Sequence, residues 1–260
     1  IVGQLPKMIT DIAIDSRSVQ PNSVFICIKG FTVDGHDYAQ KAVDAGATII
    51  VTERLLELEG VIAQVIVKNT TRTLGILAAK FFDYPSKDIM MIGVTGTNGK
   101  TSVSGIIHNI LIGLGEKSAL SGTIGFNLNG VLYESANTTS DSLNTQQMIF
   151  RAKSEGCRAM VMEVSSHGLA LGRLAGVDYD VAVFTNLTHD HLDFHGTMEN
   201  YGNTKGLLFS QLGQDLEKNK HVVLNADDPW SERYAQITPF PIWTYGLKNN
   251  AVFRAVNCHY

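Results

Sequence analysis

Cysteine is scarce in this chain, and its placement excludes two classes of small protein. The 260 residues include three cysteines, Cys27, Cys157 and Cys258, which lie far apart and lack the paired spacing of metal ligands. Neither a disulfide framework nor a cysteine-rich zinc site is therefore indicated. We expect reduced thiols, two of them in the apolar core, in a cytoplasmic protein.

Long apolar runs and a surplus of positive charge are also missing. No stretch approaches the length that spans a bilayer, and no signal peptide is visible at the N-terminus. The net charge of −4 lacks the basic surplus that is typical of nucleic-acid-binding proteins. We therefore expect neither a membrane nor a nucleic acid as a partner, and we predict a monomer.

Methionine is absent from the first position. The chain starts at Ile1 and stops at Tyr260, inside a stretch that reads as a strand. We interpret it as a fragment of a longer protein. At 260 residues it is still long enough for two domains with separate cores.

Short strands and helices alternate throughout the chain. Residues 1–86 read as a small N-terminal α/β domain, and Pro85 ends its last helix just before a new apolar run. Residues 87–260 read as a second domain, which we expect to be incomplete at its C-terminal end. Its apolar runs alternate with helical patterns, which predicts a P-loop-type, mostly parallel sheet with helices on both faces. The strands are expected at 88–92, 158–164, 180–186 and 221–225, and the helices at 102–111, 145–155 and 198–212.

A glycine-rich loop is the feature around which the second domain is organised. Between the first strand and the first helix, residues 93–101 read Gly-Val-Thr-Gly-Thr-Asn-Gly-Lys-Thr. Glycines let backbone N–H groups approach an anion, and the helix that follows adds the positive end of its dipole. Lys100 would reach the outer phosphates of a nucleoside triphosphate, and the Thr101 hydroxyl would ligate Mg²⁺.

The loop departs from the ordinary P-loop spacing, because Val94 stands where that pattern has its first glycine. The alternative is a strand-to-helix turn that merely needs glycines. Gly-Lys-Thr at the junction of a strand and a helix favours the nucleotide interpretation.

Polar residues collect where three predicted strands end, after residues 163, 186 and 225. The carboxyl ends of parallel strands form one edge of a sheet, where ligands bind. Glu163 ends a buried strand, where an unpaired carboxylate is unfavourable, so we interpret it as an Mg²⁺ ligand. Alternatively, it reaches solvent or caps a neighbouring element.

Three histidines, His189, His191 and His195, follow the strand that ends at Asn186 and suggest zinc. Zinc sites tend to need three or four nitrogen or sulfur ligands, and no cysteine lies nearby. Acidic residues are interspersed with these histidines. A loop near phosphates and Mg²⁺ fits this mixture better than a zinc cage.

Lys205 and Arg173 are ambiguous from the residues alone. Lys205 lies on the predicted helix 198–212, where a lysine is normally a solvated charge. Arg173 could pair with a substrate carboxylate or phosphate, or lie on the surface. The segment 165–167, Ser-Ser-His, is not interpreted as a nucleophile–base pair, because neighbours at a strand end point apart and no nucleophile-elbow motif is present.

Several segments together resemble the Mur ligase family, and most closely its MurE-type members. The loop is similar to theirs from Gly96 to Ser102, which accounts for its misfit to the ordinary pattern. The resemblance covers nearly the whole chain in the same order. It rests on the segments 15–17, 29–35, 96–102, 137–139, 162–169 and 190–197.

This resemblance implies an ATP-dependent amide ligase that adds the third amino acid to UDP-N-acetylmuramoyl-L-alanyl-D-glutamate in peptidoglycan synthesis, through an acyl phosphate. The first domain would bind the UDP-sugar and the second ATP with Mg²⁺. The partners would be the UDP-N-acetylmuramoyl dipeptide and a free amino acid, which is L-lysine, meso-diaminopimelate or another amine. Family members have a further C-terminal domain, so we expect this chain alone to turn over poorly or not at all.

The resemblance also implies roles for individual residues. The catalytic residues would be Lys100, Glu163, His191 and Lys205. Mg²⁺ would be held by Thr101, Glu163, His191 and a carbamate formed from CO₂ on Lys205. The nucleotide would contact Gly96, Thr97, Asn98, Gly99, Lys100, Thr101, Ser102, Asn186 and Asn225. The UDP-sugar dipeptide would contact Ser16, Asn137, Thr138, Thr139, Ser165 and Arg173.

Two departures from the family concern substrate contacts. Ser140 stands where a proline commonly follows Asn-Thr-Thr, and Leu171 replaces a polar residue before Arg173. One alternative is another ligase of the superfamily, of folylpolyglutamate or cyanophycin type, against which the segment 15–17 argues. A second is a non-catalytic nucleotide-binding homologue, against which the four intact catalytic residues argue.

Overall fold

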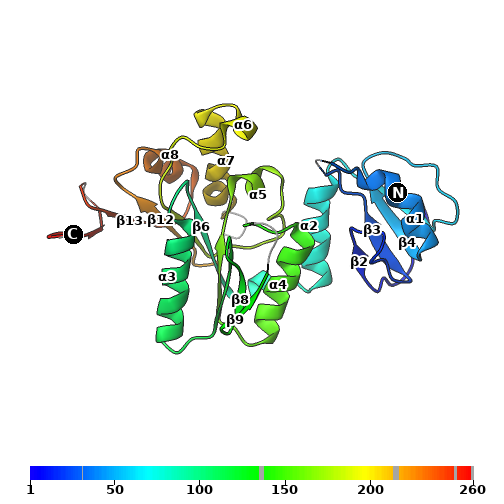
Figure 1. Ribbon diagram of the computed structural model, residues 1–260, viewed down its shortest axis with the longest axis horizontal. Helices are drawn as coiled ribbons and strands as arrows, with labels where there is room; N and C mark the ends of the chain where they lie inside the picture. Colours follow the sequence, from blue (N-terminus) through cyan, green and yellow to red (C-terminus); the bar gives the residue numbers. More distant parts are fainter. Residues whose placement is uncertain (31, 135–137, 213–216, 249–250, 259–260) are drawn as a thin grey trace. The chain divides into compact units, whose positions relative to one another are not determined.

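The computed structural model describes residues 1–30, 32–134, 138–212, 217–248 and 251–258. The chain divides into two compact units, residues 1–81 and 82–260, both drawn in Figure 1. Within the described ranges, every helix is too short or too polar to cross a bilayer. Cys27 and Cys157 are buried, as expected, Cys258 is exposed, and all three are free cysteines.

The first unit is built on a five-stranded sheet in the order β1-β5-β4-β3-β2, parallel except for β1 at one edge. Apolar side chains of β3 and β4 pack against α1, which lies on the sheet in the blue part of Figure 1. The elements are β1 (Val2–Gly3), β2 (Ile12–Ala13), β3 (Ser23–Ile26), η1 (Gly35–Tyr38), α1 (Ala39–Asp44), β4 (Ala47–Thr52), β5 (Ala63–Ile66) and α2 (Thr70–Phe81).

The second unit is built on a nine-stranded sheet in the order β14-β13-β12-β11-β6-β10-β7-β8-β9. Its strands are β6 (Met90–Thr95), β7 (Ser118–Gly122), β8 (Gly125–Leu128), β9 (Val131–Tyr133), β10 (Ala159–Glu163), β11 (Val181–Phe184), β12 (His221–Asn225), β13 (Ile242–Gly246) and β14 (Phe253–Arg254). Its helices are η2 (Pro85–Lys87), α3 (Lys100–Gly113), α4 (Ser142–Ser154), α5 (Ser166–Ala170), α6 (Leu192–His195), α7 (Met198–Gln211) and α8 (Trp230–Ile237).

Helices cover both faces of this sheet. On one face, α3 packs Val103, Ile107 and Leu111 against the central strands. On the other, α4, α5, α7 and α8 enclose the larger core with β6, β10, β11 and β12 (Figure 1). All pairings from β14 to β7 are parallel, so the predicted mostly parallel sheet is confirmed.

Three details differ from the sequence prediction. The central strand β6 continues to Thr95 instead of ending at residue 92, because Gly93 and Val94 pair with Met162 of β10 and Val183 of β11. The helix α3 begins at Lys100, two residues early. The antiparallel hairpin β7-β8-β9 was not predicted, since its strands are short and carry little apolar periodicity.

The register brings the ends of the central strands to one level. Glu163, the last residue of β10, pairs with Val94, and Phe184, the last residue of β11, pairs with Thr95. The residues that follow these strands therefore meet at one edge of the sheet, beside the glycine-rich loop after β6.

Candidate active site

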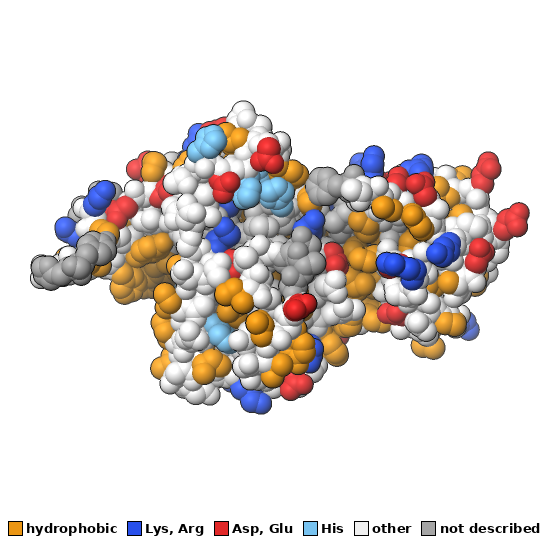
Figure 2. Space-filling model, viewed as in Figure 1, with side chains coloured by type: hydrophobic (Ala, Val, Ile, Leu, Met, Phe, Trp, Pro, Cys, Tyr) orange, Lys and Arg blue, Asp and Glu red, His pale blue; other side chains and the backbone are white. Residues whose placement is uncertain are grey.

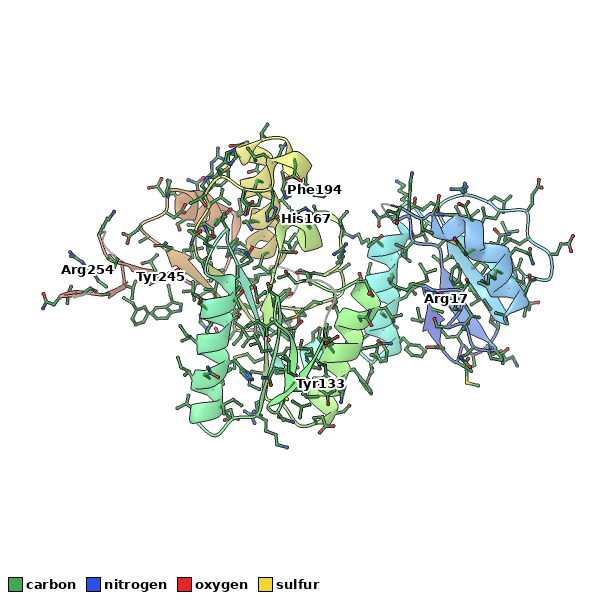
Figure 3. All side chains as sticks on the ribbon, in the orientation of Figure 1. Arg17, Tyr133, His167, Phe194, Tyr245 and Arg254 are labelled. Atoms are coloured by element: carbon green, nitrogen blue, oxygen red, sulfur yellow. The ribbon has the colours of Figure 1, made fainter. Side chains whose placement is uncertain are left out.

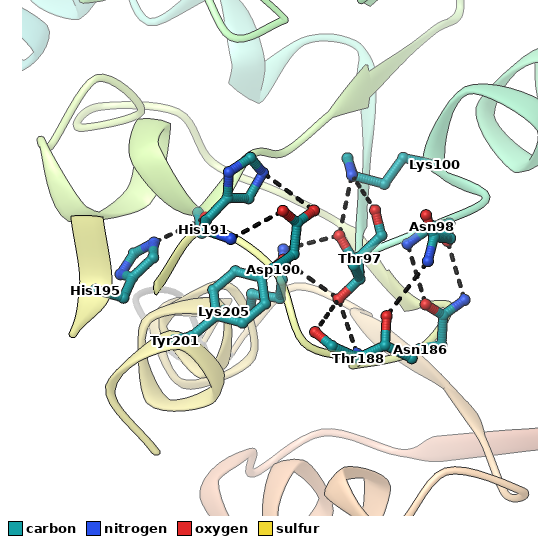
Figure 4. A network of polar contacts seen from close by, with 12 residues as sticks. Thr97, Asn98, Lys100, Asn186, Thr188, Asp190, His191, His195, Tyr201 and Lys205 are labelled. Atoms are coloured by element: carbon teal, nitrogen blue, oxygen red, sulfur yellow. Dashed lines mark hydrogen bonds and ion pairs between the residues drawn. The ribbon is translucent and has the colours of Figure 1, made fainter. Parts of the chain in front are cut away.

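The glycine-rich loop is fixed by the segment that follows β11. Asn98 donates its backbone N–H to Asn186 Oδ1 at 3.0 Å, while Asn186 Nδ2 donates to the Asn98 carbonyl at 3.0 Å (Figure 4). Thr97 N donates to the Asn186 carbonyl at 2.7 Å. Asn225, at the end of β12, donates to the Thr185 carbonyl at 2.8 Å and so supports this segment from behind. Asn186 and Asn225 thus shape the loop.

Gly96 is required by close approach. It has φ +151°, and a Cβ there would lie 1.9 Å from Thr185 Oγ1. Gly99, with φ +82°, precedes the first turn of α3, which has no side-chain cap in the described structure. Because Asn186 occupies the N–H groups of Thr97 and Asn98, the groups left to face an anion are those from Gly99 through the exposed Ser102.

Lys100 folds back onto the loop. Its Nζ donates to the carbonyls of Gly96 at 3.0 Å and Thr97 at 2.8 Å (Figure 4). Burial lowers the pKa of Lys100, against the opposing attraction of Glu163 and Asp190. Two backbone carbonyl dipoles therefore hold the ammonium at the loop. An anion bound there would be a stronger hydrogen-bond acceptor for it.

Glu163 is 2% exposed at the end of β10 and lies beside the loop helix. Its Oε2 accepts from Thr101 Oγ1 at 2.9 Å. No lysine, arginine or histidine in the described structure lies within ion-pair distance of it. A buried carboxylate next to a hydroxyl, with no cation of the protein on it, is a donor set that suits Mg²⁺.

Lys205 is buried in α7, which corrects its interpretation as a solvated lysine from the residues alone. Its Nζ donates to the same Gly96 carbonyl at 2.8 Å and lies 4.6 Å from the centroid of the Tyr201 ring. Burial, together with the nearby ammonium of Lys100, lowers the pKa of Lys205 to about 7. A large fraction of this amine is therefore uncharged at neutral pH.

Aromatic and histidine side chains line the region around α5, α6 and α7. His191, at φ +51° before α6, lies 3.5 Å from an Asp190 oxygen through Nε2. The ring of His167 lies 5.0 Å from that of His191 and 4.3 Å from that of Phe194, and Figure 3 labels both His167 and Phe194. Figure 2 shows histidine side chains gathered beside acidic ones on this part of the unit.

These histidines do not make a zinc cage. His195 is buried, and its Nε2 lies 3.0 Å from Ser166 Oγ. Burial lowers the pKa of His195 and of His167. Among the described residues, no three His, Cys, Asp or Glu side chains converge on a point that could hold a metal. A site made from a hydroxyl, one carboxylate, one histidine and a modified lysine has only two such side chains and falls outside these groups.

Three of the predicted substrate residues, Thr139, Ser165 and Arg173, form a second cluster next to Glu163. Thr139 Oγ1 donates to the Glu163 carbonyl at 3.1 Å and accepts from the Ser165 N–H at 3.1 Å. Arg173 donates to the Thr139 carbonyl at 3.3 Å, and Ser165 Oγ caps α5. Asn137 lies outside the described residues. Ser16 is buried in the first unit.

Sequence reasoning missed two residues that contact several of the predicted ones. Tyr201 lies one helical turn before Lys205, and its hydroxyl lies 3.3 Å from Thr97 Oγ1. The i, i+4 spacing on one helix was the signal that could have revealed it. Thr123, in the turn between β7 and β8, contacts Glu163 through its backbone N–H and its hydroxyl. No pattern in the sequence marks that contact.

Two models of known protein families match this chain. Residues 94–260 match the Mur ligase middle domain, and residues 8–82 match the Mur ligase family catalytic domain. The chain belongs to the Mur ligase family. The resemblance seen in the sequence is therefore confirmed.

Named relatives of this Mur ligase chain include L-lysine ligases of staphylococci. It is 51% identical over 257 residues to the UDP-N-acetylmuramoyl-L-alanyl-D-glutamate--L-lysine ligase of Staphylococcus haemolyticus, and 47% identical to that of Staphylococcus aureus strain COL. Each alignment covers 99% of this chain and 52% of the relative. The chain thus spans about half the length of these relatives.

Solved structures agree on the fold. A UDP-N-acetylmuramoyl-L-alanyl-D-glutamate--2,6-diaminopimelate ligase superposes with a TM-score of 0.80 at 29% identity, over 96% of this chain and 51% of that one. The MurF ligase from Thermotoga maritima in complex with ADP superposes with a TM-score of 0.61 at 22% identity, over 92% of this chain and 51% of that one. At that identity the second likeness shows the fold alone.

Proposed function

We propose that this Mur ligase chain belongs to an ATP-dependent ligase that joins an amino acid to UDP-N-acetylmuramoyl-L-alanyl-D-glutamate in the cytoplasm. The observation that supports it most strongly is the convergence of Lys100, Glu163 and Lys205 around the Gly96–Thr101 loop. Relatives at about half identity carry this activity in their names, with L-lysine as the amino acid, which favours L-lysine here.

The proposed reaction has two steps. The terminal carboxylate of the dipeptide attacks the γ-phosphorus of ATP, forming a C–O–P bond and releasing ADP. The neutral amine of the amino acid then attacks the acyl carbon, an amide bond forms, and phosphate leaves with one proton released. Positioning and charge neutralisation carry most of such catalysis, so Lys100 and the N-terminal end of α3 are the groups we assign to the phosphates.

Mg²⁺ fits the residues present. We assign Thr101, Glu163, His191 and a carbamate on Lys205 to hold it. When bound, it would neutralise charge on the phosphate oxygens. The chain's own contribution is the pair of oxygen atoms already 2.9 Å apart at Thr101 and Glu163.

The environment of Lys205 favours the carbamate. An amine must lose its proton before its nitrogen can attack CO₂, and the pKa of Lys205 is lowered to about 7 by burial and by Lys100. Attack forms an N–C bond and releases a second proton, so that the two steps together turn a buried cation into an anion. An anion would remove the repulsion between Lys205 and Lys100.

The substrate residues are assigned by position. Thr139, Ser165 and Arg173 lie around the end of β10, and Thr138 is linked to it through the Thr123 hydroxyl. There they would meet the part of the dipeptide that reacts. We assign Ser16 and Asn137 to the same substrate by resemblance. The guanidinium of Arg173 suits a carboxylate.

Calorimetric titration with UDP-N-acetylmuramoyl-L-Ala-D-Glu tests this assignment. We expect the chain to bind it and Arg173→Ala to bind at least about 10-fold more weakly. The exposed Arg151, which bonds Tyr133, provides a matched control, and Arg151→Ala should bind like the parent. Binding that Arg173→Ala retains in full would contradict the assignment.

The same titration separates the alternatives. A ligase of folylpolyglutamate type would not bind the uridine nucleotide. A non-catalytic homologue would bind it but would lack ligase activity, and its Lys205 would carry no carbamate. Because the chain aligns with only about half the length of its relatives, we also expect it to release little phosphate by itself. Release that depends on both the dipeptide and the amino acid would contradict that expectation.

A further inference from the structure

Thr123 lies between Glu163, which we assign to Mg²⁺, and Thr138, which we assign to the substrate. Its backbone N–H donates to Glu163 Oε1 at 2.9 Å, and its hydroxyl donates to Glu163 Oε2 at 3.2 Å. The same hydroxyl lies 3.1 Å from Thr138 Oγ1. One side chain thus contacts both the carboxylate assigned to Mg²⁺ and a threonine assigned to the substrate.

The chemistry of these groups fixes the direction of the hydrogen bonds. An ionised carboxylate only accepts, and a threonine hydroxyl has one hydrogen. If Thr123 gives that hydrogen to Glu163, it must accept from Thr138. The two hydrogen bonds therefore run in one direction: Thr138 donates to Thr123, and Thr123 donates to Glu163.

The backbone around Thr123 is shaped to hold this carboxylate. Gly122, the last residue of β7, faces the end of Glu163, and a Cβ there would lie 2.0 Å from Oε1. The strand β7 pairs with β10 in parallel up to Ser121 and Met162. The sheet therefore places Gly122 and Thr123 next to both carboxylate oxygens.

We propose that Thr123 is a positioning residue that couples binding of the sugar-nucleotide substrate at Thr138 to binding of the metal–nucleotide complex at Glu163. This inference rests on the proposed function. Hydrogen bonds in a chain polarise one another. A substrate oxygen that takes the hydrogen of Thr138 weakens the bond from Thr123 to Glu163. Glu163 Oε2 then becomes a better ligand for a cation.

Coupling of this kind is reciprocal and measurable as a change in affinity. We expect saturating UDP-N-acetylmuramoyl-L-Ala-D-Glu to tighten binding of Mg²⁺ with a non-hydrolysable β,γ-imido analogue of ATP by about 5-fold or more. The measurement is calorimetric titration of the whole chain with and without the dipeptide substrate.

Two substitutions at one position isolate the hydroxyl. Thr123→Val keeps the shape and the backbone N–H but lacks the hydroxyl, so we expect both ligands still to bind and the tightening to disappear. Thr123→Ser restores the hydroxyl and should restore the tightening. Thr73→Val is the matched control, because the Thr73 hydroxyl, in α2 of the first unit, donates to the Asn69 carbonyl one turn earlier.

Three outcomes would overturn the inference. The parent could bind both ligands without tightening, Thr123→Val could keep the tightening, or Thr123→Ser could lose it as fully as Thr123→Val. A parent that binds neither ligand would instead remove the proposed function, and the inference with it. Circular dichroism of each variant shows whether it folds.

Discussion

Lys205 and Lys220 are both buried in the second unit, yet they lie at opposite ends of its parallel strands. Lys220, just before β12, forms an ion pair with Asp178 and donates to the Tyr179 carbonyl at 2.8 Å. Lys205, beside the loop after β6, has a carbonyl and an aromatic ring as its partners in the described structure. The same residue type is thus compensated at one end of the sheet and not at the other.

The carboxylates show the same contrast. Burial would raise the pKa of Asp178, but its bonds to Lys220 and Lys218 outweigh that effect and hold the pKa below its usual value. Glu163 has hydroxyl and N–H donors but no protein cation within ion-pair distance among the described residues. Paired buried charges are typical of structural networks, whereas uncompensated ones mark places where a ligand supplies the missing charge.

Removing Lys220 should have the largest effect on stability. Lys220→Met leaves Asp178 with Lys218 alone, and breaking a buried pair is expected to lower the free energy of unfolding by about 3 kcal/mol. Urea unfolding followed by tryptophan fluorescence reports on this unit, because Trp230 and Trp243 both lie in it.

The exposed Lys117, which donates to the Glu155 carbonyl, provides the control for that measurement. Lys117→Met should change stability by less than about 0.5 kcal/mol. Equal losses of stability in Lys220→Met and Lys117→Met would mean that the ion pair with Asp178 does not stabilise the unit.

Removing Lys205 should raise the free energy of unfolding, whereas removing Lys220 should lower it. Its pKa is lowered to about 7 in the folded chain and is about 10.4 in an unfolded one. The unfolded chain therefore holds the proton more tightly, and the stability of the parent rises with pH between those values. Lys205→Met should thus stabilise the unit by about 2 kcal/mol at pH 6, and by progressively less toward pH 10.

This second comparison is made in CO₂-free buffer, so that carbamate formation does not contribute. The Gly96 carbonyl keeps Lys100 as a donor in the variant. A Lys205→Met chain that is less stable than the parent at pH 6 would show that the buried ammonium is compensated after all.

Crowding the carboxylate should cost less than breaking an ion pair. In Gly122→Ala the new Cβ would meet Glu163 Oε1 at 2.0 Å, so the side chain must move, and we expect a loss of about 1–2 kcal/mol. Gly105, inside α3 with open space around it, is the matched control. Gly105→Ala should gain about 0.5–1 kcal/mol, because alanine favours a helix. If Gly122→Ala left the stability unchanged, the Glu163 side chain would be shown to move aside without loss.

Much of this arrangement follows from local patterns. The apolar runs predicted the central strands, and the order of strand, glycine loop and helix predicted that polar residues after residues 163, 186 and 225 would share one edge. Such predictions succeed because parallel strands between helices all point the same way. They need no knowledge of which strands are neighbours.

Contacts that depend on neighbours could not be predicted. Lys220 and Asp178 are paired across 42 positions, and Thr123 reaches Glu163 only because the short strand β7 lies beside β10. The burial of Lys205 depends on how α7 packs, so the residue alone reads as a surface lysine. Its role, and that of the other site residues, stays a prediction from the family resemblance.

Neutralising Glu163 should have the smallest effect on stability, and comparing it with the neutralisation of Asp178 is the most direct test of the contrast. Glu163→Gln removes a charge that has no protein cation on it, and its amide can still accept from the Thr123 N–H, so we expect a change below about 1 kcal/mol. Asp178→Asn leaves the buried Lys220 unpaired and should cost at least twice as much. Binding of the Mg²⁺–nucleotide complex should respond in the reverse order, with at least about a 10-fold loss in Glu163→Gln and none in Asp178→Asn. If Glu163→Gln destabilised the chain as much as Asp178→Asn while leaving Mg²⁺-dependent binding unchanged, Glu163 would be a structural charge like Asp178, and the contrast between the two ends of the sheet would not mark the site.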